Sequence, residues 1–273
     1  MPDTKRFRNL DAPPVLIGGC ARSGTSLLLS VLSAHPSVYA IEQEEWAFLP
    51  RATRDEFAAD CGNFCRAWAD VEVPDAARRW AEKTPKNVVM FGPLLDAFGD
   101  HLRLIHIVRD GRDVVTSMHP EDEVRYWVPV EQWIGDASAG LAWFDHPQVL
   151  TVRYEDLVAN HRPTVARICE FLEEPLTDTV MRWHDRATVR QHSSWGWSDV
   201  SPLFTSSVRR WERPEYRDRV DEFMRCDRAA ALLGALGYLD DGPMCGAELA
   251  RLCERDIDHE RAYWLGVERP GLG

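Results

Sequence analysis

Residues 13–35 read PPVLIGGCARSGTSLLLSVLSAH, and this stretch decides the fold. Its short apolar run ends in two glycines, which predicts a buried strand of a parallel sheet. The apolar positions that recur after Gly24 predict a helix, which ends where Pro36 follows His35. In a turn of this kind, consecutive backbone N–H groups and the positive end of the helix dipole converge on an anion. The stretch therefore predicts an anion site where a strand meets a helix.

The loop departs from the phosphate loop of nucleoside triphosphatases. Gly19 and Gly24 have the GxxxxG spacing, but Thr25 and Ser26 follow instead of Lys and Ser/Thr. The nearest cation is Arg22. Because the missing lysine is the group that reaches the β- and γ-phosphates, the loop fits a phosphate but lacks the triphosphate clamp. A glycine turn that serves only the chain geometry is the alternative interpretation.

Strands and helices alternate along the rest of the chain. The apolar patterns predict strands at 102–108 and 148–154, and helices at 53–81, 110–118, 171–187 and 228–239. This alternation predicts an α/β fold, a three-layer sandwich with a central parallel sheet flanked by helices, whose ligands bind at the carboxyl ends of the strands. We expect a single domain over 1–273, with an N-terminal extension at 1–13 and a C-terminal helical segment at 243–273.

Composition excludes several classes of function. The net charge of −12 argues against broad binding to nucleic acid or to anionic membranes. No apolar run approaches the roughly 20 residues of a membrane span, and no signal-peptide stretch precedes the first strand, so we expect no membrane insertion and no export. The 7 cysteines form no CxxC pairs, which favours a reducing cytoplasm and no metal site.

A second polar turn follows the strand predicted at 102–108. Arg109 stands at the end of that strand, and Ser117 lies eight residues further on. A guanidinium fork and a hydroxyl suit a phosphate monoester. The alternative is a surface ion-pair cluster of Arg109 with Asp110, Arg112 and Asp113, and we expect Arg112 and Asp113 to be surface charges in either case. Two separate anion sites favour a ligand that is phosphorylated at distant positions.

At these residues the chain resembles the family of sulfotransferases that use 3′-phosphoadenosine 5′-phosphosulfate (PAPS). The resemblance covers roughly residues 14–215, and its motifs occur in order. They are GGCARSGTSLL at 18–28, AEKTPKN at 81–87, HIVRDGRDVVTS at 106–117, VRYEDLV at 152–158 and SSVRRW at 206–211. The tyrosylprotein branch and bacterial members are the most similar.

The resemblance implies roles for the matching residues. PAPS would be the co-substrate and adenosine 3′,5′-bisphosphate (PAP) the product, with no metal. Lys83 matches the lysine that stabilises the transferring group or the bridging oxygen. The residues that match the site for the 5′ end of PAPS are Arg22, Ser23, Gly24, Thr25 and Ser26. Those that match the 3′-phosphate site or complete the nucleotide site are Arg109, Ser117, Tyr154, Ser206, Ser207 and Arg210.

The candidate base differs from that of the His-dependent cytosolic sulfotransferases. Those enzymes carry His after a Lys-Thr pair, whereas here Pro85 follows Lys83 and Thr84. The tyrosylprotein and glycan branches use a Glu after the first helix, and this chain has three there. Glu44 is the first choice, Glu42 the second and Glu45 the third. Solvated charges at a helix start are the alternative for each of them.

These residues predict transfer of a sulfuryl group to a hydroxyl or amine, by in-line attack with a Glu as base. The acceptor could be a small molecule, a glycan or a peptide, and the oligomeric state stays open. Five tryptophans fall where such enzymes build acceptor pockets, with core packing as the alternative: Trp127, Trp133, Trp143, Trp195 and Trp197. The rival functions are a P-loop kinase for a small molecule and a catalytically inactive nucleotide-binding relative.

Overall fold

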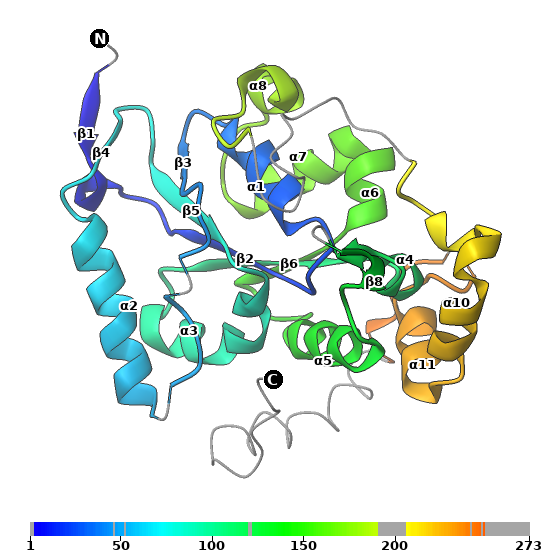
Figure 1. Ribbon diagram of the computed structural model, residues 1–273. Coiled ribbons are helices and arrows are strands. Elements are labelled where there is room, and N and C mark those ends of the chain that lie inside the picture. The colour runs from blue at the N-terminus through cyan, green and yellow to red at the C-terminus, as the bar shows by residue number, and fades with distance from the viewer. Residues whose placement is uncertain are drawn as a thin grey trace.

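A five-stranded parallel sheet forms the centre of the protein in the computed structural model, which describes residues 3–45, 47–51, 53–119, 122–190, 206–240, 242–246 and 248 (Figure 1). The spatial order of the strands is β3 (Val38–Ala40), β5 (Arg79–Lys83), β2 (Val15–Gly18), β6 (Arg103–Val108) and β9 (Val149–Arg153). Because all neighbouring pairs are parallel, the carboxyl ends of all five strands lie at one edge of the sheet.

Helices cover both faces of the sheet, as the alternation of side chains along β2 requires. Val15 and Ile17 pack into one hydrophobic cluster with α1 (Thr25–Ser33) and α7 (His161–Phe171). Leu16 points to the other face, into a cluster with α2 (Arg54–Trp68) and α3 (Phe91–Phe98). Figure 1 shows α1, α6 (Tyr154–Ala159) and α7 on one side of the sheet and α2, α3 and α5 (Val130–Leu141) on the other. The predicted three-layer α/β sandwich is confirmed.

A third cluster joins α5 (Val130–Leu141) to α10 (Arg217–Met224) and α11 (Asp227–Ala235), beside the turn that follows β6. Two small antiparallel pairs complete the sheets, β1 with β4 and β7 with β8. The remaining elements are β1 (Thr4–Arg6), η1 (Phe7–Asn9), β4 (Glu72–Pro74), η2 (Pro85–Met90), α4 (Gly111–Val115), β7 (Met118–His119), β8 (Asp122–Tyr126), α6 (Tyr154–Ala159), α8 (Asp178–Met181), α9 (Trp183–Arg186), η4 (Arg210–Glu212) and η5 (Pro214–Tyr216).

Three of the predicted helices are shorter than expected. The helix predicted at 53–81 ends at Trp68, and β4 and β5 follow it. The charged residues of β5 are typical of a surface helix, so the sequence pattern did not predict a strand there. Arg79 is nevertheless buried in β5, where it is hydrogen-bonded to Glu174. The helix predicted at 110–118 ends at Val115 and gives way to β7. Within 171–187, Glu173 adopts φ 57° and Pro175 follows, so that only the short α8 and α9 form.

The predicted strands at 102–108 and 148–154 are confirmed as β6 and β9, and the helix at 228–239 as α11. Within the predicted extension, residues 3–13 pack against the rest of the protein, since β1 pairs with β4 and Phe7 is buried. Most of the segment at 243–273 lies outside the described residues. Among the described helices, none has the length and apolar character that a bilayer span requires.

Candidate functional site

The side chains singled out from the sequence gather at the carboxyl edge of the sheet. The glycine loop follows β2, Lys83 ends β5, and Arg109 follows β6. The acidic segment at 42–45 follows β3, and Tyr154 follows β9. Because β2 lies between β5 and β6, the loop separates Lys83 on one side from Arg109 on the other. Five loops far apart in sequence therefore form one site.

Backbone hydrogen bonds fix the conformation of the glycine loop and leave the Ser23 hydroxyl group without a hydrogen-bond partner in the described structure. Gly24 is the N-cap of α1 with φ 96°. The Gly19 N–H donates to the Pro85 carbonyl at 3.0 Å, and the Ser23 N–H donates to the Cys20 carbonyl at 3.1 Å. The Ser23 side chain is 1% exposed, and its Oγ has no hydrogen-bond partner within the described structure. A buried hydroxyl without a partner is costly, so an anion bound in the loop would satisfy it.

Replacing Gly24 with alanine is expected to destabilise the protein by about 1–3 kcal/mol, because φ 96° disfavours any side chain. The new Cβ would also lie 2.5 Å from Tyr154 Cδ2. Gly135→Ala is the matched control, since Gly135 lies in α5 with nothing within 4 Å of the added Cβ. That control should stabilise the helix by about 0.5–1 kcal/mol. Chemical denaturation of both variants measures the difference, and equal stabilities would contradict the strained role of Gly24.

Three arginines converge on the loop. Burial lowers the pKa of Arg22, and the charges of Arg109 and Arg210 lower it further. The pKa of Arg210 is lowered by burial and then by Arg109. The Nε atoms of Arg109 and Arg210 are buried without a hydrogen-bond partner in the described structure. Each arginine in this cluster repels the positive charge of the others and so disfavours their protonated form. An anion placed among the three side chains would offset this repulsion.

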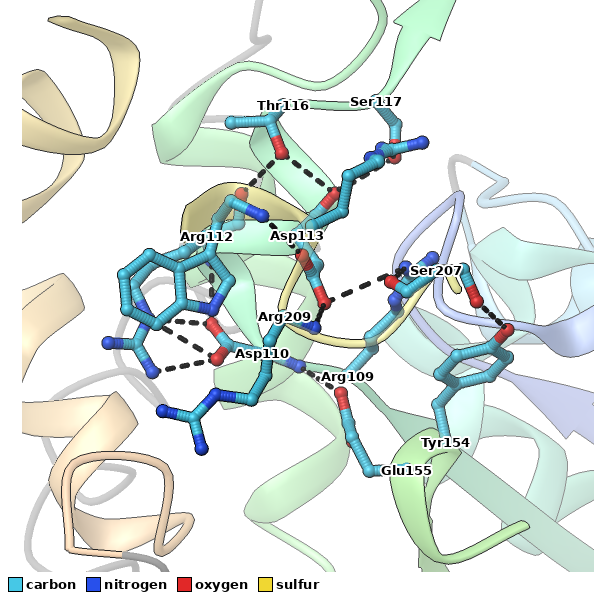
Figure 2. A network of polar contacts seen from close by, with 12 residues as sticks. Arg109, Asp110, Arg112, Asp113, Thr116, Ser117, Tyr154, Glu155, Ser207 and Arg209 are labelled. Carbon is cyan, nitrogen blue, oxygen red and sulfur yellow. Dashed lines mark hydrogen bonds and ion pairs between the residues drawn. The ribbon is translucent and has the colours of Figure 1, made fainter. Parts of the chain in front are cut away.

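Arg109 connects the loop with the segment at 206–211. Its guanidinium donates to the Arg22 carbonyl at 2.9 Å and to the Ser207 carbonyl at 2.5 Å. Figure 2 shows Arg109 beside Ser207 and Tyr154. It also lies over the ring of Tyr154, 4.5 Å from the centroid. The Tyr154 hydroxyl and the Ser207 hydroxyl are hydrogen-bonded at 2.7 Å. Arg210 donates to the Ser117 hydroxyl at 2.9 Å. The structure thus brings together these five residues, which the sequence placed in one site.

The prediction that Arg112 and Asp113 are surface charges is wrong. Asp113 is 0% exposed, and its two carboxylate oxygens accept the N–H groups of Arg209 at 2.9 Å and Trp211 at 3.0 Å. Arg112 pairs with Asp110 at 2.7 Å, donates to the Tyr238 carbonyl and lies 3.8 Å from the centroid of the Trp211 ring. The two side chains hold the 206–211 segment over the site. Apart from Asp110, the partners of these two side chains are Arg209, Trp211 and Tyr238, which lie 96 to 126 residues downstream, where no local pattern reveals them.

Lys83 and Glu44 form an ion pair at the other side of the loop. The Lys83 side chain is 1% exposed and donates from Nζ to Glu44 Oε1. Burial lowers the pKa of Lys83, while the adjacent Glu44 raises it. Glu42 is exposed, and the backbone N–H of Glu45 donates to Glu82 at 3.4 Å. Of the three candidate carboxylates, Glu44 is the one that contacts the candidate lysine.

The predicted tryptophans have different environments. Trp133 is buried in the core and donates to the Arg109 carbonyl at 3.2 Å. Trp127 lies near the loop, with the Arg22 guanidinium 5.4 Å from the centroid of its ring and the His119 ring tilted against it at a centroid distance of 4.9 Å. Trp143 packs against the cluster of α2 and α3. Trp195 and Trp197 lie outside the described residues.

A parallel sheet whose central strand ends in a glycine loop, with a second cationic site on the next strand, defines a P-loop-like α/β protein. The family model described as "Sulfotransferase family" matches residues 13–69 and 58–178, more than half of the chain. The chain therefore belongs to the sulfotransferase family.

Three similar proteins share little sequence identity with this chain. A "Protein-tyrosine sulfotransferase" of Drosophila melanogaster is 24% identical in an alignment of 205 residues that covers 63% of this chain. The chain spans about 40% of the length of that relative. The solved "Sulfotransferase Domain from the Synechococcus PCC 7002 Olefin Synthase" has a TM-score of 0.50 at 18% identity, covering 82% of this chain and 96% of that one. Mouse sulfotransferase SULT7A1, complexed with PAP, has a TM-score of 0.51 at 16% identity, covering 84% and 90%. The two structures support the fold.

Proposed function

We propose that this protein is a PAPS-dependent sulfotransferase that transfers a sulfuryl group to a hydroxyl or amine. The observation that carries the proposal is the spatial order of three features along the sheet edge. Arg109 and Ser117 lie beyond β6, the glycine loop follows the central β2, and the Lys83–Glu44 pair lies beyond β5. A nucleotide phosphorylated at both ends of its ribose, with a sulfuryl group on the 5′-phosphate, matches this order.

The residues present fit such a ligand. Arg22, Ser23 and the loop N–H groups would hold the 5′-phosphosulfate, and Thr25 and Ser26 stand at the start of α1, where the helix dipole favours an anion. The 3′-phosphate would be held by Arg109 and Arg210 together with three hydroxyl groups, those of Ser117, Ser207 and Tyr154. The buried, unpartnered Ser23 Oγ, Arg109 Nε and Arg210 Nε supply donors for these oxygens. The mouse protein solved with PAP supports a nucleotide of this type.

The reaction would proceed by in-line attack on sulfur. The acceptor O–H or N–H gives its proton to Glu44 while a new bond forms to sulfur and the bond from sulfur to the bridging phosphate oxygen breaks. That oxygen leaves with PAP and gains negative charge. Lys83 and Arg22 stabilise the charge on the bridging and sulfuryl oxygens, in a buried setting where such interactions are strong. No His follows Lys83 and Thr84, so Glu44 takes the role of base.

Two experiments test the proposal. Thermal shift should show stabilisation by PAP that ATP with Mg²⁺ does not match, because the loop has Thr25 where a kinase has lysine. Label from ³⁵S-PAPS should then move to at least one member of a panel of tyrosine peptides, phenols, amines and glycans. Stabilisation by ATP–Mg²⁺ alone would favour the kinase, and PAP binding without transfer would favour the inactive relative.

The acceptor side and the cellular setting belong to the same proposal. The rings of Trp127 and His119, which contact each other beside Arg22, offer an aromatic surface near the reacting end, which suits a sugar or a phenol.

The described cysteines are all free thiols, in accord with a reducing cytoplasm: Cys20, Cys61, Cys65, Cys169, Cys226 and Cys245. No cluster of three or more metal-ligating side chains occurs within the described ranges. We propose one domain, without nucleic acid as a partner.

Asp113→Asn is expected to weaken PAP binding about 10-fold, the effect of one lost hydrogen bond to a charged group. The amide keeps a single acceptor oxygen, so either the Arg209 or the Trp211 N–H would face an NH₂ group. The segment that carries Ser207 and Arg210 would then be held less firmly over the 3′-phosphate site. Calorimetry with PAP measures the change, and an unaltered affinity would mean that the segment docks without this carboxylate.

A further inference from the structure

Glu82 is a buried carboxyl group that the proposed mechanism does not use. It is 0% exposed, in the middle of the sheet on β5, directly before Lys83. Burial raises the pKa of Glu82 to about 7, and hydrogen bonds from Thr84 and Asn87 oppose this rise. Burying a carboxyl group here costs free energy compared with an apolar side chain, so its neighbours indicate what it does.

Three donors converge on this carboxylate, two from the turn after β5 and one from the acidic segment. The Thr84 hydroxyl donates to Oε1 at 2.5 Å, and the Asn87 amide donates to Oε2 at 2.7 Å. The backbone N–H of Glu45 donates to Oε1 at 3.4 Å. Above its pKa of about 7, Glu82 is ionised and has only acceptors, and it can therefore satisfy all three donors at once. A glutamine would present its own N–H donors to at least one of them.

The hydrogen-bonded partners of Glu82 surround the reacting end of the site. The Glu45 amide is the peptide group next to Glu44, and Lys83 projects from the opposite face of the same strand. Asn87 also donates to the Ile17 carbonyl at 3.2 Å, just before the glycine loop. The short η2 helix that carries Asn87 begins at Pro85, whose carbonyl accepts the Gly19 N–H. Glu82 thus links the acidic segment, the end of β5 and the loop.

We propose that Glu82 is a positioning residue that fixes Glu44 against Lys83 through the Glu45 amide and the turn after β5. The inference rests on the proposed function for the roles of Glu44 and Lys83. Glu82 lies on the β5 side of the loop, away from Arg109 and Ser117 on the β6 side. Its loss should therefore affect the transfer step and leave nucleotide binding intact.

The test compares Glu82→Gln with Glu170→Gln, the same change on the exposed side of α7. Once the wild type is shown to transfer label from PAPS, Glu82→Gln should lower kcat about 10–100-fold, the usual cost of a misplaced catalytic group. The Kd for PAP should stay within about 3-fold of the wild type, because the side chains that would contact PAP are all retained and Glu82 reaches the glycine loop only through Asn87 and the turn after β5. Glu170→Gln should match the wild type in both. An unchanged kcat in folded Glu82→Gln overturns the proposal.

Hydrogen exchange gives a second measurement that does not need turnover. The backbone amides at 42–45 should exchange at least about 10-fold faster in Glu82→Gln, with α1 unchanged, since local opening is independent of global stability. Faster exchange throughout the protein, with a parallel loss of PAP affinity, would show a merely structural role. If the wild type transfers no sulfuryl group, the proposed function fails while this measurement still decides whether Glu82 holds the acidic segment.

Thr84→Val covers the case in which Glu82→Gln does not fold. It removes one of the three donors and keeps the carboxylate and the volume of the side chain. We expect a fall in kcat of about 3–10-fold with PAP affinity intact, as for the loss of one positioning hydrogen bond. A variant with wild-type kcat and wild-type exchange at 42–45 would overturn the proposal.

Discussion

Replacing Glu44 with glutamine is expected to lower kcat by about 10²–10⁴-fold, the range for a positioned general base. The change keeps the shape of the side chain and removes the group that accepts the proton of the acceptor. It also leaves the buried Lys83 without its carboxylate partner, so that burial lowers the pKa of the lysine with less opposition. Steady-state transfer from ³⁵S-PAPS measures the loss, and calorimetry should show PAP affinity close to that of the wild type.

Glu42→Gln is the comparison for this experiment. Glu42 lies in the same segment, is exposed and was the second choice from the sequence. Both variants lose one negative charge, so a general electrostatic effect on the site would lower kcat similarly in the two. A large loss of kcat in Glu44→Gln, with little change in Glu42→Gln, would identify Glu44 as the general base. Near-normal turnover in Glu44→Gln with a large loss in Glu42→Gln would transfer the role to Glu42.

Local patterns predicted the parts of the site that are continuous in sequence. The apolar run and the glycines at 15–24 are sufficient to predict a strand, a loop and a helix, because the conformation of each depends on residues that are adjacent in the sequence. The same holds for Arg109 after β6 and Tyr154 after β9. The resemblance to the family also assigned the segment at 206–211 to the site of Arg109 and Tyr154. In the structure Arg109 contacts this segment at Ser207.

Charged residues in the interior were harder to predict. Arg79, Glu82 and Asp113 occur in stretches that are typical of surface helices and turns, yet all three are buried. Their partners are Glu174 for Arg79, the Glu45 amide for Glu82, and the 209–211 backbone for Asp113. A buried charge is stable only when such partners are present, and these lie between 37 and 98 residues away. Only the folded chain reveals them.

The Arg109→Ala variant should bind PAP about 10²–10³-fold more weakly than the wild type, because two or more hydrogen bonds to a charged group are lost. The hydrogen bonds from the guanidinium to the Arg22 and Ser207 carbonyls also disappear, so the 206–211 segment is held less firmly, whereas the loop keeps the hydrogen bonds of the Gly19 and Ser23 N–H groups. Arg103→Ala is the control, since Arg103 begins the same strand at its opposite end and pairs with Glu173. It loses the same charge and should bind PAP normally.

Comparison of PAP with AMP separates loss of the 3′-phosphate contact from general damage to the site, because the two ligands differ only in that phosphate. The wild type should prefer PAP strongly. In Arg109→Ala this preference should nearly vanish while the affinity for AMP changes little, since the loop that would hold the 5′-phosphate keeps its donors. A variant that loses affinity for both ligands equally would place Arg109 in the scaffold of the loop, and the 3′-phosphate would then be bound elsewhere.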